Sequence, residues 1–572
     1  IHTAKSSSAQ PGTVLHHWYL LINSGCLPPN TNETSRKLHV QFLSLHIFNL
    51  SDSAYKMSSV RANVPNRASS TALHWPVTTL SLCRGPAPFR SHIRSAHASA
   101  APVTKDAPTA KQLKQKQVGG GGKALEVSVT PRSEDFSKWY LDVVSKAELA
   151  DYGPVRGTMV IRPYGYSIWE TIQSYLDGRF KELGVDNAYF PQLIPYSFIT
   201  KEAEHVEGFA PELALVTKGG GKDLDEPLVV RPTSETIINH MFAQWVQSHR
   251  DLPLRVNQWC NVHRWEMRTR PFVRTLEFLW QEGHTAHATA EEAEEEARRM
   301  INVYTDFAVT MAGMPVVPGR KSRIESFAGA NCTYTIEAMM GDRRALQAGT
   351  SHNLGTNFAK AFGTQYLDRE SKRQFVHQTS WGVSTRIIGG IIMTHGDDKG
   401  LRLPPRVAPI QVVIIPIVKK EEDRVPVNEA AQRLRDAAKA AGIRVKIDAD
   451  ERQTPGWKYN HWEMRGVPVR VEVGPKDVQS GTCVTARRDR PGKEGKQMGI
   501  SMEPGAFVDH VQGLLGEIQA GLRAQATAFR DTNIVDVRTY DELKEAIAMG
   551  KWVRGGWAAS DEDEKRVKEE TQ

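Results

Sequence analysis

The chain has 572 residues, which is too long for a single hydrophobic core, so we expect two or three domains. Its formal net charge of +8 suits a polyanionic partner, but an excess of this size does not identify one. No apolar run approaches the ~20 residues of a membrane span, which argues against a membrane protein. The five cysteines show neither metal-ligand spacing nor the density of a disulfide framework, which indicates a reducing compartment.

The N-terminal segment, residues 1–124, is predicted to be disordered: an upstream or targeting sequence followed by a linker. The first methionine is Met57, so residues 1–56 are interpreted as upstream sequence or as part of a longer precursor. From Met57 to Lys105 there is no Asp or Glu, and five arginines are spread through a Ser- and Ala-rich stretch. This composition is typical of an organellar transit peptide, of chloroplast or mitochondrion. A merely disordered tail is the alternative. The run QLKQKQVGGGGKA then predicts a flexible linker.

The first folded residues read as helices and short strands in turn. Residues 133–152 and 164–183 have helical periodicity, and the strand TMVIRP between them stops at Pro163. NAYFPQLIP predicts another strand and TKGGGKDLDEP a hairpin turn. A helix should then begin at Thr233, Ser234 and Glu235. Two explanations of these residues remain open: capping alone, or a helix start that projects hydroxyls and a carboxylate toward a ligand.

The stretch RWEMRTRPFVRTLEFLWQEGHTAH, residues 264–287, is predicted to be two antiparallel strands joined by a basic loop. With a period of two, Arg264 and Glu266 share one face of the first strand. Five even-numbered side chains share one face of the second strand: Arg274, Phe278, Trp280, Glu282 and His284. This face mixes guanidinium, carboxylate, imidazole and indole groups. The ordinary explanation is a solvated face with ion pairs; the other is a ligand site.

Residues 288–402 are predicted to add a helix and further strands. The acidic run Glu291–Glu296 is most simply a solvated face near the N-terminus of an amphipathic helix. ALQAGTSHNLG is expected to place Gln347, Thr350 and His352 in a turn between strand and helix. In SWGVSTRIIGGIIM, Arg386 opens an apolar run that must be buried, so we expect this arginine to have a fixed anionic partner.

The pattern changes at Ala408. IQVVIIPI, RVKIDAD and VPVRVEVG read as strands that alternate with two helices, which predicts a compact α/β domain with a mainly parallel sheet to about residue 505. Residues 506–572 continue with a long helix, a short helix (YDELKEAIAM) and a charged end.

The motifs of the first folded region resemble those of class II aminoacyl-tRNA synthetases. RWE, a basic loop, then Arg274, Phe278 and Glu282 match motif 2; VRGTMVIRPYGYSIWE matches motif 1 and SWGVSTR motif 3. The strings RPTSET, LWQEGHTAHAT, ALQAGTSHNLG and SWGVSTRIIG resemble the prolyl-tRNA synthetases, and the similarity covers roughly residues 125–572. Only about a hundred residues separate His287 from Trp381, so the resemblance is to the archaeal and eukaryotic type, which lacks an editing insertion.

The resemblance implies three folded parts. Residues 125–407 would be the class II catalytic domain, an antiparallel sheet flanked by helices. Residues 408–505 would be an α/β anticodon-binding domain, and 506–572 a small α+β C-terminal region that is apparently truncated. Members of this type usually end in a domain with cysteine zinc ligands; no cysteine follows Cys483 here, so no metal site is expected.

The resemblance also implies ATP-dependent activation of L-proline to prolyl-adenylate and transfer to the 3′ end of tRNA(Pro), with ATP and Mg²⁺ as cofactors. It implies a homodimer formed through motif 1, without membrane association. Two alternatives are kept. One is another class IIa specificity, such as threonyl, whose zinc-ligand cysteine and histidines are not apparent here. The other is a synthetase-like RNA-binding or regulatory protein without catalysis. The presence of the three motif arginines, Arg264, Arg274 and Arg386, argues against this alternative.

The resemblance assigns roles residue by residue. The catalytic residues would be Arg264 and Arg386, because arginines must hold the charge that builds as a carboxylate attacks a phosphate. ATP binding is implied for Arg264, Glu266, Arg274, Thr275, Phe278, Gln347, Thr350, Ser384 and Arg386. Proline binding is implied for Thr233, Ser234, Glu235, Arg264, Trp280, Glu282, His284 and His352. Anticodon reading is implied for Arg452, Lys458, Glu463 and Arg465. For Mg²⁺ the resemblance leaves only candidates such as Glu337.

Overall fold

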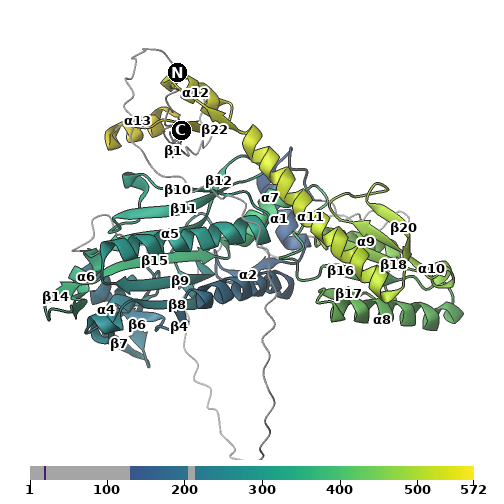
Figure 1. Cartoon of the computed structure of the whole chain (residues 1–572), viewed down its shortest axis with the longest axis horizontal. Helices are drawn as coiled ribbons and strands as arrows, with labels where there is room; N and C mark the ends of the chain where they lie inside the picture. The colour runs from purple at the N-terminus through teal and green to yellow at the C-terminus, as the bar shows by residue number, and fades with distance from the viewer. Residues whose placement is uncertain (1–17, 21–128, 204–212, 559, 572) are drawn as a thin grey trace, which may run out of the picture. The chain divides into compact units, whose positions relative to one another are not determined.

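The computed structural model describes residues 18–20, 129–203, 213–558 and 560–571 (Figure 1). The expected targeting segment and linker therefore lie outside the described residues, apart from β1 (Trp18–Leu20). In the described part of the chain, no helix is long and apolar enough to cross a membrane.

A seven-stranded sheet forms the first domain, in the order β10-β11-β12-β15-β9-β8-β4. Its strands are β4 (Asp186–Asn187), β8 (Leu254–His263), β9 (Glu277–His287), β10 (Val317–Arg320), β11 (Cys332–Met339), β12 (Ala345–Gly355) and β15 (His377–Ser384). All neighbours are antiparallel except β4 and β8, which are parallel. The expected class II type of sheet, antiparallel and flanked by helices, is confirmed.

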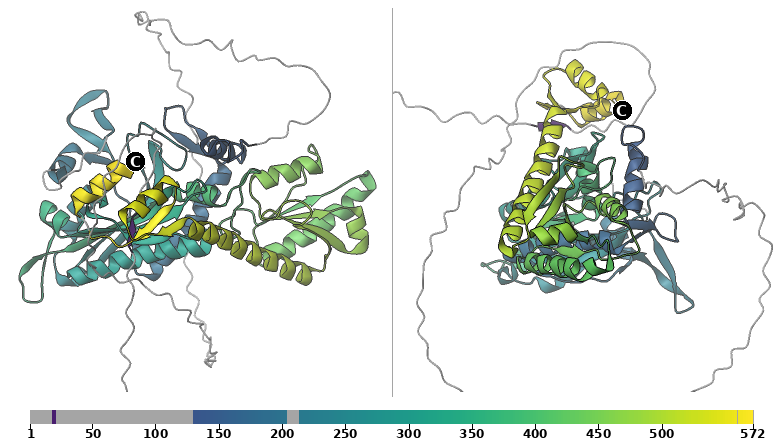
Figure 2. Two further views of the ribbon diagram at one scale, coloured as in Figure 1. Left: turned by 90° about the horizontal axis from the view of Figure 1, so that it is seen from above. Right: turned by 90° about the vertical axis from the view of Figure 1, so that its right-hand side faces the viewer.

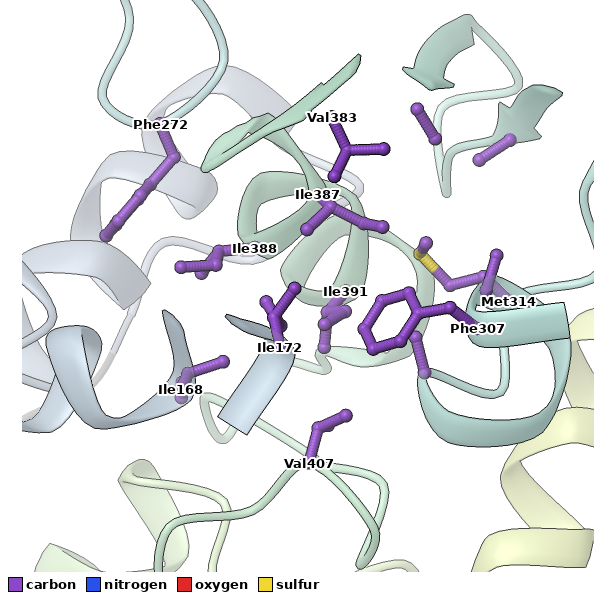
Figure 3. Packing of buried hydrophobic residues seen from close by; sticks show 14 of the residues in the cluster. Ile168, Ile172, Phe272, Phe307, Met314, Val383, Ile387, Ile388, Ile391 and Val407 are labelled. Atoms are coloured by element: carbon purple, nitrogen blue, oxygen red, sulfur yellow. The ribbon is translucent and has the colours of Figure 1, made fainter. Parts of the chain in front are cut away.

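Helices bury one large core against this sheet. They are α1 (Phe136–Lys146), α2 (Pro163–Glu182), α5 (Ala290–Asp306) with the π-helical turn η2 (Phe307–Met311), and α7 (Arg386–His395). Figure 1 shows α5 running alongside β15, and Figure 3 shows isoleucines of α2 and α7 meeting in the core: Ile168, Ile172, Ile387, Ile388 and Ile391. The run IIGGIIM is therefore buried, as its apolar composition predicts.

The acidic run of α5 is a solvated face only in part: Glu291, Glu292 and Glu295 are exposed as predicted, but Glu294 and Glu296 are not. Glu296 is 1% exposed and pairs with Arg255 and Arg299. Glu294 accepts hydrogen bonds from Tyr334 and Asn353. Because α5 lies on the sheet, the acids that face the strands become paired and partly buried, and only the outer ones meet water.

A smaller layer packs around α4. It contains β5 (Leu193–Pro195), α3 (Tyr196–Ala203), β6 (Leu215–Gly219), β7 (Lys222–Val230), α4 (Glu235–Trp245), η1 (His249–Asp251), α6 (Asn357–Phe362), β13 (Gln365–Leu367) and β14 (Arg373–Phe375). The predicted hairpin turn joins β6 and β7 through Gly220 and Gly221, both at positive φ. A separate hairpin pairs β2 (Ala150–Tyr152) with β3 (Met159–Ile161), directly before α2.

The second domain has a five-stranded sheet in the order β17-β16-β18-β19-β20. Its elements are β16 (Val412–Pro416), η4 (Glu421–Asp423), α8 (Arg424–Ala440), β17 (Val445–Ile447), α9 (Pro455–Met464), β18 (Val469–Val473), α10 (Pro475–Ser480), β19 (Thr482–Arg487), β20 (Lys496–Ser501) and α11 (Pro504–Thr532). Odd and even residues of β16 face different layers: Val412 and Ile414 pack with α8 and α11, Val413 and Ile415 with Trp462 of α9.

The prediction of a mainly parallel second sheet is wrong. β17, β16 and β18 are parallel, but β19 and β20 are antiparallel additions. The connection after β18 is α10, which ends after six residues at Gly481 with φ 65. So short a connection cannot carry the chain back for a parallel crossover.

The predicted domain boundary at residue 505 falls at the start of α11, the long yellow-green helix in Figure 2. The first two thirds of α11 pack into the second core, through residues from Phe507 to Leu522. The C-terminal region follows with β21 (Ile534–Asp536), α12 (Tyr540–Ala548), β22 (Trp552–Gly555) and α13 (Asp561–Thr571). β22 pairs with β21 and with β1.

Candidate active site

Two adjoining cavities, of about 290 Å³ and about 200 Å³, lie at the centre of the first domain. They share four lining residues: Arg264, Phe278, Ser384 and Arg386. Of the other expected ligand contacts, the larger cavity is lined by Thr233, Glu235, Trp280, Glu282, His284, Gln347, Thr350 and His352, and the smaller by Glu266, Arg274 and Thr275. Ser234 alone lies behind the wall, fully buried. Residues spread over more than 150 positions of the chain thus meet in one place.

The predicted first strand ends earlier than its alternation suggests. β8 stops at His263, so Arg264, Glu266 and Arg274 belong to the loop before β9. The Arg264 amide still donates to Leu276 O at 2.8 Å, but Arg270 and Arg274 then close a tight turn around Phe272, which has φ 60. In this loop Arg274 Nε lies 3.1 Å from Glu266 Oε2.

Glu282 is held by a buried network at the floor of the larger cavity. Its carboxylate accepts hydrogen bonds from Ser234 Oγ at 2.5 Å and from Gln258 Nε2 at 2.6 Å, and lies 3.1 Å from His284 Nε2. Burial alone would raise the pKa of Glu282, but His284, Ser234 and Gln258 together lower it. Burial likewise acts to lower the pKa of His284, and the nearby carboxylates Glu282 and Glu235 raise it. Glu282 and His284 therefore form a buried ion pair.

The helix start at Ser234 is not a cap of the ordinary kind. Ser234 makes no side-chain bond to its own helix, and its hydroxyl donates to Glu282 instead. The wall that Ser234 supports also contains Glu235, which is 4% exposed and accepts a hydrogen bond from the Thr233 hydroxyl. Within the described ranges no ion pair includes Glu235. The cavity thus holds a buried carboxylate that has a hydroxyl partner but no cation bonded to it.

Arg264 reaches into both cavities. Its Nε donates to Pro232 O at 3.1 Å, and its Cζ lies 5.6 Å from the ring centroid of Phe278 and 5.2 Å from that of Trp280. Both distances suit cation–π contacts. The Arg264 guanidinium is accessible from the cavity but shielded from bulk water by the surrounding protein. This desolvation lowers the pKa of Arg264, and the nearby carboxylates Glu235 and Glu282 act to raise it.

Arg386, the first residue of α7, donates from Nε to Val273 O at 3.0 Å. The anionic partner expected for it is not a carboxylate: among the described side chains none forms an ion pair with Arg386. Burial lowers the pKa of Arg386, and the positive charges of Arg264 and Arg274 lower it further, while Glu337 opposes them. Three guanidinium groups around one small cavity call for a ligand with several negative charges.

Gln347, Thr350 and His352 lie within β12, so the turn predicted for them is wrong. The small residues of ALQAGTSHNLG allow close packing beside β11 and β15, which extends the strand. Gln347 Oε1 accepts a hydrogen bond from Lys321 Nζ at 2.6 Å. His352 Nδ1 lies 2.9 Å from Thr333 Oγ1.

Several groups of the site carry no signal in the sequence. Lys321, Glu325 and Phe327, which line the larger cavity, come from the segment between β10 and β11. Gln258 of β8 lies behind the cavity wall and bonds to Glu282. The amide of Gln258 has a defined orientation, because its Oε1 accepts the Phe190 N–H at 3.0 Å and so directs Nε2 to Glu282. Such residues are found only when strands far apart in sequence are paired.

The four residues expected to read an anticodon do not gather at one surface. Lys458 is buried, and its Nζ donates to Asp448 O at 2.8 Å. Arg465 pairs with Glu148 of the first domain. Glu463 pairs with Arg470, and Arg452 is exposed beside Asp450.

Three histidines with lowered pKa values predict how stability depends on pH. Burial, chiefly, lowers the pKa of His287 and His352 to about 3 and that of His395 to about 4. Below pH 6.5 the unfolded chain therefore binds protons that the folded chain does not. Each of these histidines lowers the free energy of unfolding by about 1.4 kcal/mol for every pH unit below that point. His284, whose pKa is raised in the folded chain, acts in the opposite direction and offsets part of this loss, but the three histidines with lowered pKa values outweigh it.

We expect the Tm to fall when the pH is lowered from 7 to 5.5, as measured by differential scanning calorimetry. His395→Gln keeps a donor for Ala312 O, which accepts from His395 Nε2 at 2.8 Å, and removes one titrating group. Its Tm should fall less over the same interval. An equal or larger fall would contradict this origin of the pH dependence.

Two family models match the chain. The tRNA synthetase class II core domain (G, H, P, S and T) matches residues 216–395, and the anticodon binding domain matches residues 411–512.

Among curated proteins, the chain is 67% identical over 444 residues to the chloroplastic/mitochondrial proline--tRNA ligase of Arabidopsis thaliana, which covers 78% of this chain and 82% of the relative. It is 56% identical to the proline--tRNA ligase of Roseiflexus sp. (strain RS-1), over 77% of this chain and 92% of the relative. Among solved structures it matches prolyl-tRNA synthetase from Cryptosporidium parvum, complexed with halofuginone and AMPPNP. That match has a TM-score of 0.73 and 43% identity, over 78% of this chain and 91% of the other.

Proposed function

The chain belongs to the proline--tRNA ligase family of class II aminoacyl-tRNA synthetases, and on that premise we propose how its residues divide the reaction. The enzyme activates proline with ATP and transfers it to tRNA. The substrates of the first step are a small zwitterion and a polyanion, and the two cavities offer a matching set of charges.

The observation that carries the proposal is the pairing of Glu235 with Arg264 in one cavity. Glu235 is a buried carboxylate without a bonded cation, and Arg264 is a guanidinium in the same cavity. Proline has one secondary ammonium and one carboxylate. We assign the ammonium to Glu235 and the Thr233 hydroxyl, and the carboxylate to Arg264. Trp280 and the Glu282–His284 pair, which Ser234 supports, close the pocket around the ring, with His352 on its far wall.

ATP is assigned to the arginines and their neighbours. Arg274, with Glu266 and Thr275, and Arg386, with Ser384, line the smaller cavity, and Gln347 and Thr350 extend the binding surface into the larger one. Phe278 provides a face for adenine. A proline carboxylate oxygen attacks the α-phosphorus, the bond to the bridging oxygen breaks, and pyrophosphate leaves with its electron pair. Arg264 and Arg386 hold the charge that develops.

Mg²⁺ accompanies ATP in this proposal. Glu337 of β11 is buried and faces Gln347 of β12 in the strand register. Burial raises the pKa of the Glu337 carboxyl, so a cation beside it would relieve the cost of its charge. Carboxylate and amide oxygens are suitable Mg²⁺ ligands, and the ion would neutralise phosphate charge. EDTA should abolish the reaction and excess Mg²⁺ restore it; activity in EDTA would contradict the assignment.

Proline-dependent ATP–pyrophosphate exchange by the purified protein tests the function directly. Exchange with proline and not with threonine or alanine is the expected result. Exchange with threonine alone would overturn the specificity, and no exchange with any amino acid would favour a synthetase-like protein without catalysis.

The second domain is proposed to bind the anticodon of tRNA(Pro). Of the four expected readers, Arg452 is the most accessible, since its guanidinium is exposed and pairs only with the exposed Asp450. Lys458, Glu463 and Arg465 are engaged with protein groups and are assigned to hold α9 in place.

A homodimer is proposed through the hairpin β2–β3, which carries motif 1. Three of its apolar side chains are exposed: Tyr152, Val155 and Val160. An apolar cluster of this kind favours burial against a second copy. Val160→Asp should convert the dimer to a monomer in light scattering after gel filtration, whereas Val425→Asp, at an exposed valine of α8, should not. A monomeric wild type would contradict this proposal.

An organellar location, in chloroplast and/or mitochondrion, is proposed from the acid-free, arginine-bearing segment after Met57 and from the organellar relative in Arabidopsis thaliana. Residues 57–120 fused to a fluorescent reporter should direct it to one or both organelles. A reporter that stays in the cytosol would contradict the proposal.

A further inference from the structure

The segment between β10 and β11, residues 321–327, forms part of the wall of the larger cavity. Lys321 donates from Nζ to Gln347, on the side assigned to ATP. Phe327 lies at the other end, with its ring 4.7 Å from that of His352 on the proline side. Glu325 stands between them and also lines the cavity. This short segment therefore borders both substrate sides, with Lys321 at the ATP side and Phe327 at the proline side.

One face of the C-terminal helix α13 binds this segment at three points. Arg323 Nε donates to Asp561 Oδ2 at 2.6 Å, and Ser322 Oγ donates to Glu564 Oε1 at 2.7 Å. Lys568 pairs with Glu325. Asp561, Glu564 and Lys568 are spaced by three and four residues, so they share one helix face. Glu564 is only 5% exposed, which shows that the contact excludes water at its centre.

The C-terminal region is also anchored beside this segment, so α13 does not depend on the ion pairs alone. Trp552 of β22 packs with Val317 and Met339 of β10 and β11. Its Nε1 donates to Arg343 O at 2.7 Å, and Arg343 Nη1 donates to Met549 O at 3.0 Å. An apolar contact thus fixes the region on the strands that lead into and out of the segment.

The charge of Glu325 gives the contact with Lys568 a specific consequence. ATP brings several negative charges into a cavity whose wall already contains Glu325. An unpaired carboxylate at the wall would repel the phosphates. Lys568, which lies outside the catalytic sheet, neutralises the negative charge of Glu325. The attraction of ATP to Lys321, Arg264 and Arg386 is then not reduced by repulsion from Glu325.

We propose that Lys568 of the C-terminal helix is a positioning residue for ATP binding, which acts by pairing with Glu325 at the cavity wall. The inference rests on the proposed ATP site. Through this contact the C-terminal region supports the wall of the active site.

The test compares Lys568→Gln, Lys565→Gln and the double variant Glu325→Gln/Lys568→Gln in proline-dependent pyrophosphate exchange. Lys568→Gln should raise KM for ATP about three- to fivefold, the size expected for a half-exposed ion pair, with kcat and KM for proline within about twofold. Lys565 is exposed on α13 and, among the described residues, makes no hydrogen bond or ion pair with residues 321–327; it is the matched control and should behave as wild type. The double variant has no carboxylate left to neutralise, so its KM for ATP should return toward the wild-type value.

Two outcomes would overturn the proposal. One is that Lys568→Gln leaves KM for ATP unchanged, as in the control. The other is that the double variant is no better than the single one, which would indicate that α13 acts only as a structural support. In that case the Tm and kcat should fall together without a selective change in KM for ATP. Failure of the proposed function itself is distinguishable, because the wild-type protein would then show no proline-dependent exchange.

Discussion

Replacing Arg264 with alanine is expected to lower the rate of proline-dependent ATP–pyrophosphate exchange by about 10²- to 10³-fold, the range found when a preorganised donor to a developing charge is removed. Arg264 is suited to this role because it lines both cavities, and the rings of Phe278 and Trp280 hold its guanidinium in place. The carboxylate of proline and the α-phosphate of ATP repel each other as they approach. Of the other three residues that line both cavities, Phe278 and Ser384 have no charge, and Arg386 is the only guanidinium that remains without Arg264.

The matched control for this change is Arg268→Ala, an exposed arginine four residues further along the same loop. Exchange by this variant should stay within about threefold of wild type, since surface charges away from such features usually have small effects. tRNA binding, measured by filter retention, should be unchanged in Arg264→Ala. Equal loss of exchange and tRNA binding, with a lower Tm, would show that Arg264 serves the structure through its bond to Pro232 O.

Replacing Glu235 with glutamine is expected to raise KM for proline by about 10²-fold while KM for ATP changes by less than about threefold. The glutamine keeps the shape and a hydrogen-bond acceptor for Thr233, but it removes the negative charge. A buried ammonium that loses its counter-charge costs about 2–5 kcal/mol, which corresponds to roughly 30-fold or more. The separation between the two KM values is the informative readout, because a general loss of fold would move both.

Glu291→Gln is the control, since Glu291 is exposed in the first turn of α5 and lies outside both cavities. Steady-state exchange at varied proline and at varied ATP measures the effect in each variant. If Glu235→Gln changed both KM values alike, Glu235 would be a support of the α4 helix start. If neither changed, the ammonium would bind elsewhere, and Glu282 would be the next carboxylate to test.

Much of the fold could be predicted from local patterns. The periodicity of α2, α5 and α7, the proline at the start of α2 and the glycines of the β6–β7 turn act within a few residues, so their structures follow from the sequence near them. The incorrect predictions concern residues whose local structure or burial depends on contacts with distant strands. Gln347 and His352 sit in a strand because β11 and β15 pair on both sides of β12. Glu296 is buried because α5 lies on the sheet.

The candidate site shows the same division. By itself the sequence determined which kinds of groups the site contains, because the chemistry of zwitterion and phosphate binding requires them. These groups are an arginine-rich loop, a carboxylate and hydroxyls at a helix start, and an arginine that opens a buried helix. Only the tertiary structure decided which groups face one cavity. It placed Gln258 behind Glu282, left Glu235 without a bonded cation, and brought Lys568 to Glu325 across 243 positions of the chain. No local rule encodes such pairs, since strand pairing and domain packing bring residues together without regard to their separation in sequence.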